Sequence, residues 1–224
     1  KPLLIVAGAG AGLGQSLLHR FETGDYRVVG LVRSMPDNPV NCDLRQVDMA
    51  DADTAAAIIN EVIATYGPPK VVIHNTAELV MKPFADTTLL DFERCWCSMV
   101  KAAVVLGRSV IPSMLEGGGG VFMVSGATAS FRGGANFSAF ASAKFALRGL
   151  TQSLAREYQS AGIHVVHAIL DGIIDTERSR QLHSVDSANM MKPEDIAEAY
   201  WQVAQQPPST WTHELDLRPQ SERS

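Results

Sequence analysis

The sequence predicts an α/β fold in which a doubly wound, mostly parallel sheet carries helices on both faces. Short apolar runs alternate with amphipathic stretches along the whole chain, and this alternation is typical of repeated strand–helix–strand units. Most of the runs are continuous and rich in β-branched residues, as expected for strands that are covered on both faces. The 224 residues suit one large domain, residues 1–224, better than two ordinary ones.

The strands of the sheet are expected at the short apolar runs. These lie at Leu3–Ala7, Arg27–Val32, Leu44–Asp48, Lys70–His74, Gly120–Ser125, Ile163–Leu170 and Glu214–Leu217. The last run is expected to form an edge strand. Because right-handed crossovers through helices join successive strands, the sheet is expected to be mostly parallel.

The stretches between these runs carry apolar residues at helical spacing. Helices are expected at Leu13–Glu22, Asp51–Tyr66, Leu89–Leu115, Phe137–Gln159 and Glu194–Gln205. The last helix follows Pro193, and proline is a favourable residue in a first helical turn. The polar tail, residues 218–224, is expected to be frayed.

The composition excludes several classes of partner. With 46% hydrophobic and 19% charged residues, the chain resembles an ordinary soluble globular protein. The net charge of -5 and the lack of a basic cluster argue against a nucleic-acid partner, whose phosphates require positive surface. Since no run reaches the roughly 20 apolar residues of a membrane span, no membrane partner is expected.

The cysteines indicate a reducing compartment. Cys42, Cys95 and Cys97 are an odd number with no metal-ligand spacing, so we expect reduced thiols and no metal site. No secretory signal is visible, and the first predicted strand begins almost at the start of the sequence. Together these observations predict a cytoplasmic protein.

A glycine-rich turn joins the first strand to the first helix. It reads Ala7-Gly8-Ala9-Gly10-Ala11-Gly12-Leu13-Gly14. Glycines let the backbone approach a pyrophosphate closely, and the helix N-terminus adds N–H donors and the positive end of a dipole. A glycine repeat alone is weak evidence for a nucleotide site, but its place between the first strand and first helix supports a phosphate cradle.

The spacing of these glycines, Gly8-x-x-x-Gly12-x-Gly14, resembles that of the short-chain dehydrogenase/reductase family. The resemblance extends over nearly all of the chain. It implies a Rossmann-type sheet and a nicotinamide dinucleotide held by Gly8, Gly12, Leu13 and Gly14.

The residues after the second strand favour NADP(H) over NAD(H). The strand ends in Arg33-Ser34 with no acidic residue. An acid at this place accepts a hydrogen bond from the ribose 2′-hydroxyl, whereas an arginine suits a 2′-phosphate. The alternative is that Arg33 is a solvated surface arginine.

The resemblance also assigns cofactor contacts at the ends of the third and fourth strands. Asp48 and Met49 correspond to the pair that contacts the adenine. Asn75, Thr76 and Ala77 follow the fourth strand, where the family has an Asn-Asn-Ala-Gly segment beside the adenine ribose.

After the sixth strand, the resemblance implies a loop that borders the nicotinamide. Gly172, Ile173 and Thr176 belong to it, and Thr176 matches the threonine that contacts the carboxamide. Asp171 replaces a proline, so we expect a loop whose conformation is less fixed. The substrate loop is expected at about residues 175–190, where Arg178 and Arg180 either meet an anionic substrate or belong to a solvated lid face.

The catalytic pattern of the family is broken. Where the family has Tyr-x-x-x-Lys, this chain has Phe140-Ala-Ser-Ala-Lys144. By family spacing, the serine position falls on Ala127 and the helix asparagine on Met99. Lys144 alone remains, and Ser125 is a candidate replacement hydroxyl. Hydroxyls near the lost positions are Ser125, Thr128, Ser130, Ser138 and Ser142.

Two functions stay open. The first is an NAD(P)-dependent oxidoreductase that transfers a hydride to or from a small carbonyl, alcohol or enoyl substrate with a non-standard proton donor. The second is an inactive NADP(H)-binding protein acting as sensor, scaffold or partner subunit. In either case the resemblance implies a homodimer or homotetramer formed through the helices at 89–115 and 137–159.

Overall fold

The sheet is fully parallel and doubly wound. The computed structural model describes residues 1–36 and 42–221. Its single seven-stranded sheet has the order β3-β2-β1-β4-β5-β6-β7, and every neighbouring pair is parallel. The chain therefore builds outward from β1 on one side and from β4 on the other. This confirms the predicted fold class.

All the predicted strands form. They are β1 Leu3–Ala7, β2 Arg27–Val32, β3 Asp43–Gln46, β4 Pro69–His74, β5 Gly120–Ser125, β6 Ile163–Leu170 and β7 Glu214–Leu217. Only β3 and β4 differ from the predicted bounds, by one or two residues at an end. β7 lies at an edge of the sheet, as predicted.

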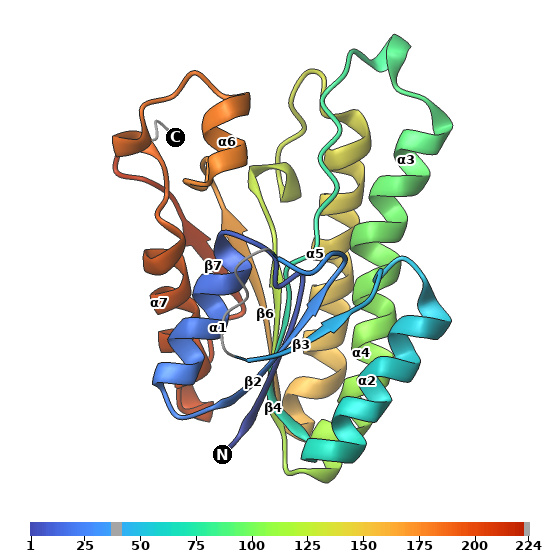
Figure 1. Ribbon diagram of the computed structural model, residues 1–224, viewed down its shortest axis with the longest axis vertical. Helices are drawn as coiled ribbons and strands as arrows, with labels where there is room; N and C mark the ends of the chain where they lie inside the picture. The colour runs from blue at the N-terminus through green and yellow to red at the C-terminus, as the bar shows by residue number, and fades with distance from the viewer. Residues whose placement is uncertain (37–41, 222–224) are drawn as a thin grey trace.

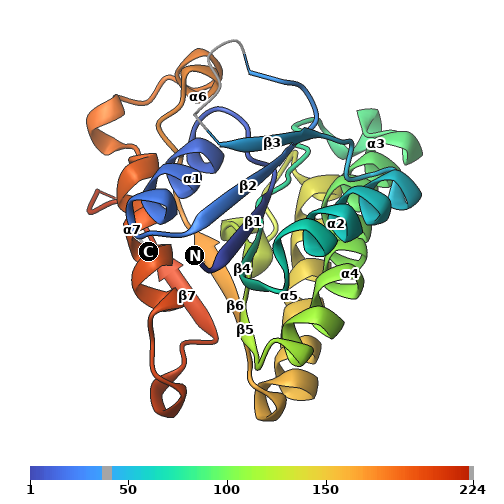
Figure 2. The same ribbon diagram turned by 60° about the horizontal axis from the view of Figure 1, so that its bottom comes forward.

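Helices cover both faces of the sheet (Figures 1 and 2). On one face lie α1 (Leu13–Thr23) and α7 (Pro193–Ala204). On the other lie α2 (Ala52–Tyr66), α4 (Ala102–Glu116) and α5 (Ser138–Tyr158). Each helix packs one apolar face on the sheet, as its periodicity predicts.

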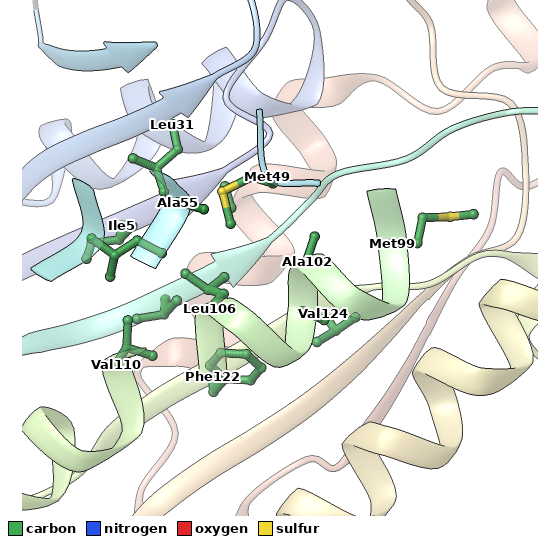
Figure 3. Packing of buried hydrophobic residues seen from close by; sticks show 14 of the residues in the cluster. Ile5, Leu31, Met49, Ala55, Met99, Ala102, Leu106, Val110, Phe122 and Val124 are labelled. Carbon is green, nitrogen blue, oxygen red and sulfur yellow. The ribbon is translucent and has the colours of Figure 1, made fainter. Parts of the chain in front are cut away.

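The core is divided into two clusters by the sheet. Alternate residues of β1 enter different clusters, with Ile5 among the α2, α4 and α5 side chains and Leu4 among those of α1 and α7. Figure 3 shows Ile5 beside Leu106 and Val110 of α4. Each such fully buried side chain stabilises the fold by about 1.5–3 kcal/mol.

The helix expected at 89–115 is interrupted in the middle. It consists of α3 (Leu89–Cys95), a π-helical turn (Trp96–Lys101) and α4. The hydroxyl of Thr76 donates to the carbonyl of Ser98 within the π turn. A side chain that takes up a helix carbonyl in this way favours a local widening of the helix.

The stretch Leu89–Glu116 is long and apolar enough to pass a length-and-composition test for a membrane span. However, 50% of its most apolar window is buried inside the molecule. It packs on the sheet through α4 (Figure 1). Buried helices of soluble proteins pass the same test, so this stretch is interpreted as a core helix.

Short elements lie in the connections. α6 (Glu177–Leu182) forms within the expected substrate loop, and Thr176 caps it by accepting from the Ser179 N–H at 3.1 Å. The 3₁₀ turns are Phe84–Asp86, Thr128–Ser130, Gln159–Ala161, Ser187–Asn189 and Pro208–Thr210. In the tail that was expected to fray, Arg218 is instead bonded to Asp216, while residues 222–224 lie outside the described part of the chain.

Candidate functional site

A cavity of about 630 Å³ opens at the carboxyl ends of the central strands. Its walls are the glycine turn, the loops after β2, β3, β4 and β6, the start of α5, and α6. The strand order reverses between β1 and β4, and ligands of doubly wound sheets bind at such a point. The volume is within the range of small-molecule and cofactor sites.

The glycine turn is held against the loop after β4. Gly8 has φ +86°, and a Cβ added there would lie 2.7 Å from the carbonyl carbon of Asn75. The Asn75 amide donates to the Gly8 carbonyl at 3.0 Å. Only glycine fits this close contact at a positive φ. Asn75 therefore fixes the shape of the turn, and Thr76 beside it lines the cavity.

The start of α1 lies against the loop after β6. Gly12 is the N-cap of α1 with φ 92°, and a Cβ there would lie 2.6 Å from the methyl group of Thr176. Leu13 and Gly14 follow in the first helical turn and are buried. The structure thus brings the predicted phosphate-binding and nicotinamide-binding segments together.

Arg33 and Ser34 line the other end of the cavity. The Arg33 side chain is 70% exposed, and its guanidinium lies 3.7 Å from a carboxylate oxygen of Glu78. The other oxygen of Glu78 accepts from Arg94 at 2.5 Å. Sequence reasoning missed Glu78, although it directly follows Ala77 in the predicted ribose segment. The cationic group predicted to meet a 2′-phosphate therefore has an acidic neighbour.

Asp48, Met49 and Ala77 line the same end of the cavity. Asp48 accepts from the Ala50 N–H at 2.9 Å, which fixes the turn after β3. Met49 is buried in the core beside Ala55 (Figure 3). The predicted adenine segment and the predicted ribose segment therefore meet at one wall.

The loop after β6 is anchored by Asp171. Its N–H, which a proline would lack, donates to the Leu217 carbonyl at 2.8 Å. Its carboxylate accepts from the Thr128 hydroxyl and lies 3.5 Å from the Arg218 guanidinium. These contacts hold the residue that stands at the proline position, and a less fixed loop conformation stays a prediction. Gly172, Ile173 and Thr176 all line the cavity.

Phe140 lines the cavity, whereas Lys144 is buried behind it. The Lys144 ammonium donates to the Ser125 carbonyl at 2.7 Å and lies 5.6 Å from the centroid of the Phe140 ring. Burial lowers the pKa of Lys144 to about 8. Lys144 is the one position at which the resemblance retains the family's catalytic pattern. In this structure its ammonium is buried and donates a hydrogen bond to the Ser125 carbonyl.

The structure does not bring the Ser125 hydroxyl to the cavity. Ser125 is buried and shares a hydrogen bond of 2.9 Å with the Tyr200 hydroxyl of α7. Successive side chains of a strand point to opposite faces, so Val124 faces α5 and Ser125 faces α7. Burial raises the pKa of Tyr200 well above its usual range. The prediction that Ser125 replaces the lost hydroxyl is therefore wrong. Its hydroxyl lies on the opposite face of the sheet from a substrate beside Phe140.

Met99 and Ala127, the positions that the resemblance assigns to the helix asparagine and the serine, have apolar side chains. Met99 is fully buried and is one of the core residues labelled in Figure 3. The Ala127 N–H donates to the Ser130 hydroxyl at 3.1 Å. Ser98, next to Met99 in the π turn, lines the cavity. Within residues 1–36 and 42–221, the cavity lining includes neither the candidate replacement Ser125 nor the other hydroxyls near the lost positions: Thr128, Ser130, Ser138 and Ser142.

Two buried histidines share the face of the sheet that carries Lys144. His74 and His167 both lie in register with Val124. Desolvation, with a smaller contribution from the Lys144 charge, lowers the pKa of His74 to about 3 and of His167 to about 4. Among the described residues, His74 Nδ1 and His167 Nε2 have no hydrogen-bond partner. Both imidazoles are therefore neutral near pH 7.

The two arginines of the predicted substrate loop have different environments. Arg180 forms two hydrogen bonds to the Asp175 carboxylate, at 2.6 and 3.0 Å. Arg178 lines the cavity, together with Ser179, Leu182 and His183 of α6 and its C-terminal end. Arg180 thus braces the base of α6, and Arg178 is the arginine of the pair that lines this cavity.

Comparisons with known proteins agree with this geometry. The sequence profile described as "short chain dehydrogenase" matches residues 2–186. A short-chain dehydrogenase from Rhodopseudomonas palustris is 33% identical, with a TM-score of 0.81 over 97% of this chain and 98% of that chain. The 7alpha-hydroxysteroid dehydrogenase of Escherichia coli is 26% identical over 87% of this chain and 84% of its own.

A more distant structure shares the fold. ElxO with NADP bound has a TM-score of 0.87 at 20% identity, over 96% of each chain. A tyrosine-to-phenylalanine variant of ElxO with NADPH bound aligns equally well, with a TM-score of 0.87. The profile match over most of the chain and the 33% identical relative show that this protein belongs to the short-chain dehydrogenase/reductase family of oxidoreductases.

Proposed function

We propose that the chain binds NADP(H) across the glycine turn and transfers a hydride to or from a small carbonyl, alcohol or enoyl substrate. The observation that carries the proposal is the single cavity that joins the glycine turn, Arg33, the loop after β6 and Phe140. The glycine turn leaves room for a pyrophosphate at Gly10, which lines the cavity and where an added Cβ would meet nothing within 4 Å.

The preference for NADP(H) rests on charge. Arg33 and Ser34 line the end of the cavity that corresponds to the adenosine, and a guanidinium there suits a 2′-phosphate. The NADP bound to ElxO supports this choice of cofactor. Glu78 holds Arg33 only loosely at 3.7 Å, so a phosphate dianion competes well for the guanidinium.

Within the described part of the chain, the site lacks an obvious side chain to donate the proton that a reduced substrate needs after hydride transfer. NADP(H) provides or accepts the hydride, and reduction of a carbonyl then leaves an alkoxide that needs a proton. Phe140 supplies none, and Lys144 is bonded to Ser125. The polar side chains that line the cavity at the π turn and at α6 are those of Ser98, Arg178, Ser179 and, directly after α6, His183. A reaction whose carbanion or enolate takes its proton from water suits this site best.

Turnover and binding experiments together test this function. Purified protein is incubated with NADPH and a panel of aldehydes, ketones, quinones and enoyl thioesters, and the absorbance of NADPH is followed. The proposal predicts oxidation of NADPH with at least one class, most readily the enoyl thioesters or quinones. Saturable NADPH binding by fluorescence without turnover across the panel would instead identify an inactive NADP(H)-binding sensor, scaffold or partner subunit.

We also propose a homodimer or homotetramer built through the two long helical stretches. Trp96 in the π turn, Val104 in α4 and Phe145 in α5 are large apolar side chains that remain exposed. Such side chains on packed helices favour contact with a second copy. Light scattering of the wild type and of Phe145→Glu tests this, since the variant is expected to shift toward the monomer.

The cytoplasm remains the proposed compartment. Cys42, Cys95 and Cys97 are free. Burial raises the pKa of the Cys42 and Cys95 thiols to about 11, so these thiols are poorly reactive. Free buried thiols of this kind are typical of proteins in reducing compartments.

A further inference from the structure

We propose that Asp171 and Arg218 are positioning residues through which the C-terminal segment holds the loop that borders the nicotinamide. The inference rests on the proposed function, because it assigns these residues to the nicotinamide half of the cofactor. Neither residue lines the cavity, so both act through Gly172 and Ile173, which do.

Asp171 links three parts of the chain at the end of β6. Its side chain is 6% exposed and lies 3.5 Å from the Arg218 guanidinium. The second carboxylate oxygen accepts from the Thr128 hydroxyl, and the N–H donates to the Leu217 carbonyl at 2.8 Å. A buried carboxylate is stable only when such partners satisfy it. These contacts therefore fix where the loop after β6 begins.

The C-terminal segment also packs directly on the loop. A Cβ added at Gly172 would lie 2.7 Å from Cδ of Pro219 and 3.1 Å from the sulfur of Met191. The Met191 N–H donates to the Ile173 carbonyl at 2.8 Å, and the Met191 carbonyl accepts from the Asp175 N–H at 2.8 Å. The loop thus runs between two supports, Pro219 on one side and Met191 on the other.

This arrangement acts on one half of the cavity only. Arg33 and Ser34 directly follow β2 and line the opposite end of the cavity, where Arg33 lies beside Glu78. A shift of the loop by a fraction of an ångström moves Ile173 and Thr176 relative to a bound ring, and misplacement on this scale is costly for positioning. Loss of the Asp171–Arg218 contact therefore weakens binding of the nicotinamide and spares the adenosine half.

Binding of two ligands distinguishes an effect on the nicotinamide half of the site from an effect on the adenosine half. NADPH carries the nicotinamide, and 2′-phospho-ADP-ribose carries the same adenosine and phosphates without that ring. Both are titrated into the wild type, Arg218→Gln and Asp171→Asn. Each variant is expected to weaken NADPH binding by about tenfold, the scale expected for one unpaired buried group. Binding of 2′-phospho-ADP-ribose is expected to stay close to the wild type, and Arg218→Lys to restore NADPH binding in part.

The control variant removes a contact at Glu214, at the opposite end of β7 from Leu217 and Arg218. Arg148 donates to the Glu214 carboxylate at 2.7 and 2.8 Å, which ties α5 to β7. Arg148→Gln is expected to lower thermal stability while leaving the NADPH to 2′-phospho-ADP-ribose affinity ratio unchanged. A purely structural role for Asp171 and Arg218 would give the same result as this control.

The outcomes are distinct. Equal weakening of both ligands, or no weakening of either, in a wild-type protein that binds both would overturn the inference alone. A wild type that binds neither ligand would overturn the proposed function, and the inference with it. If Arg218→Gln does not fold, Asp171→Asn decides. This variant keeps the backbone N–H that donates to Leu217, and its side-chain amide oxygen can still accept from Thr128.

Discussion

The ammonium of Lys144 lies 5.6 Å from the centroid of the Phe140 ring. A cation near an aromatic face is stabilised by about 0.5–2 kcal/mol. The ring lines the cavity and the ammonium does not. Phenylalanine at this position is therefore compatible with the retained lysine, and it separates the amine from the place where a substrate would react.

Restoring the lost hydroxyls should create carbonyl reductase activity. In the double variant Phe140→Tyr with Ala127→Ser, the new phenol starts from a ring that lies near Lys144, whose pKa burial holds at about 8. A positioned general acid contributes about 10²–10⁴-fold. We expect a gain on this scale in NADPH-dependent reduction of ketones and aldehydes.

The same double change in a Lys144→Met background is the control for this gain. It retains both hydroxyls but lacks the amine that activates the phenol, so it should show little of the activity. A double variant that binds NADPH and still reduces no carbonyl would contradict the view that Phe140 stands where a proton donor is missing.

Replacement of Arg33 should change the choice between the two cofactors. Arg33→Ala removes a charge-assisted contact worth about 1.5–3 kcal/mol, so NADPH affinity should fall by about 10- to 100-fold with little change for NADH. Arg94→Ala is the matched control, since Arg94 also pairs with Glu78 but does not line the cavity. An Arg33→Ala variant that binds NADPH as tightly as the wild type would identify Arg33 as a solvated surface group.

Two glycines of the same turn should differ in their tolerance of a methyl group. A Cβ at Gly8 would lie 2.7 Å from Asn75 backbone at a positive φ, whereas a Cβ at Gly10 meets nothing within 4 Å. Gly8→Ala should therefore destabilise the fold by about 1–3 kcal/mol, and Gly10→Ala should not. Urea unfolding measures both, and similar free energies of unfolding would contradict the described turn.

Acid should destabilise the protein through His74 and His167. Both histidines are neutral when folded because desolvation lowers their pKa values to about 3 and about 4, while unfolded histidine titrates near about 6.5. Stability is complete above about pH 6.5 and falls below it, since only the unfolded chain then binds the protons. The loss continues to about pH 4 for His167 and about pH 3 for His74.

The slope of this loss is measurable. Each histidine should lower the free energy of unfolding by about 1.4 kcal/mol per pH unit in that window. Urea unfolding between about pH 7 and about pH 5 should show a smaller slope for His167→Gln than for His19→Gln, an exposed position. Identical slopes for the two variants would refute the burial argument.

The strands and the glycine turn were predictable because their signals are local. An apolar, β-branched run such as Ile163–Leu170 marks a strand covered on both faces, and the turn before Leu13 marks the first helix of such a sheet. The π turn was not predictable, because it depends on a contact between Thr76 and Ser98 from distant parts of the sequence.

The placement of the site residues was predictable only in part. Motif positions such as Asn75, Arg33 and Thr176 line one cavity, and their contacts with a cofactor stay a prediction. The direction of Ser125 was not predictable, because strand alternation allows two orientations and only the packing of Tyr200 selects one. The anchoring of Asp171 depends on Arg218, which is distant in sequence.

Equilibrium titration of the wild-type protein with NADPH and with NADH tests the central claim most directly. The claim is that the cavity beside the glycine turn is an intact NADP(H) site, although Phe140 has replaced the catalytic tyrosine. Followed by nicotinamide fluorescence, the titration is predicted to show saturable binding with NADPH the tighter ligand. Absence of saturable binding at millimolar NADPH, or tighter binding of NADH, would contradict the claim.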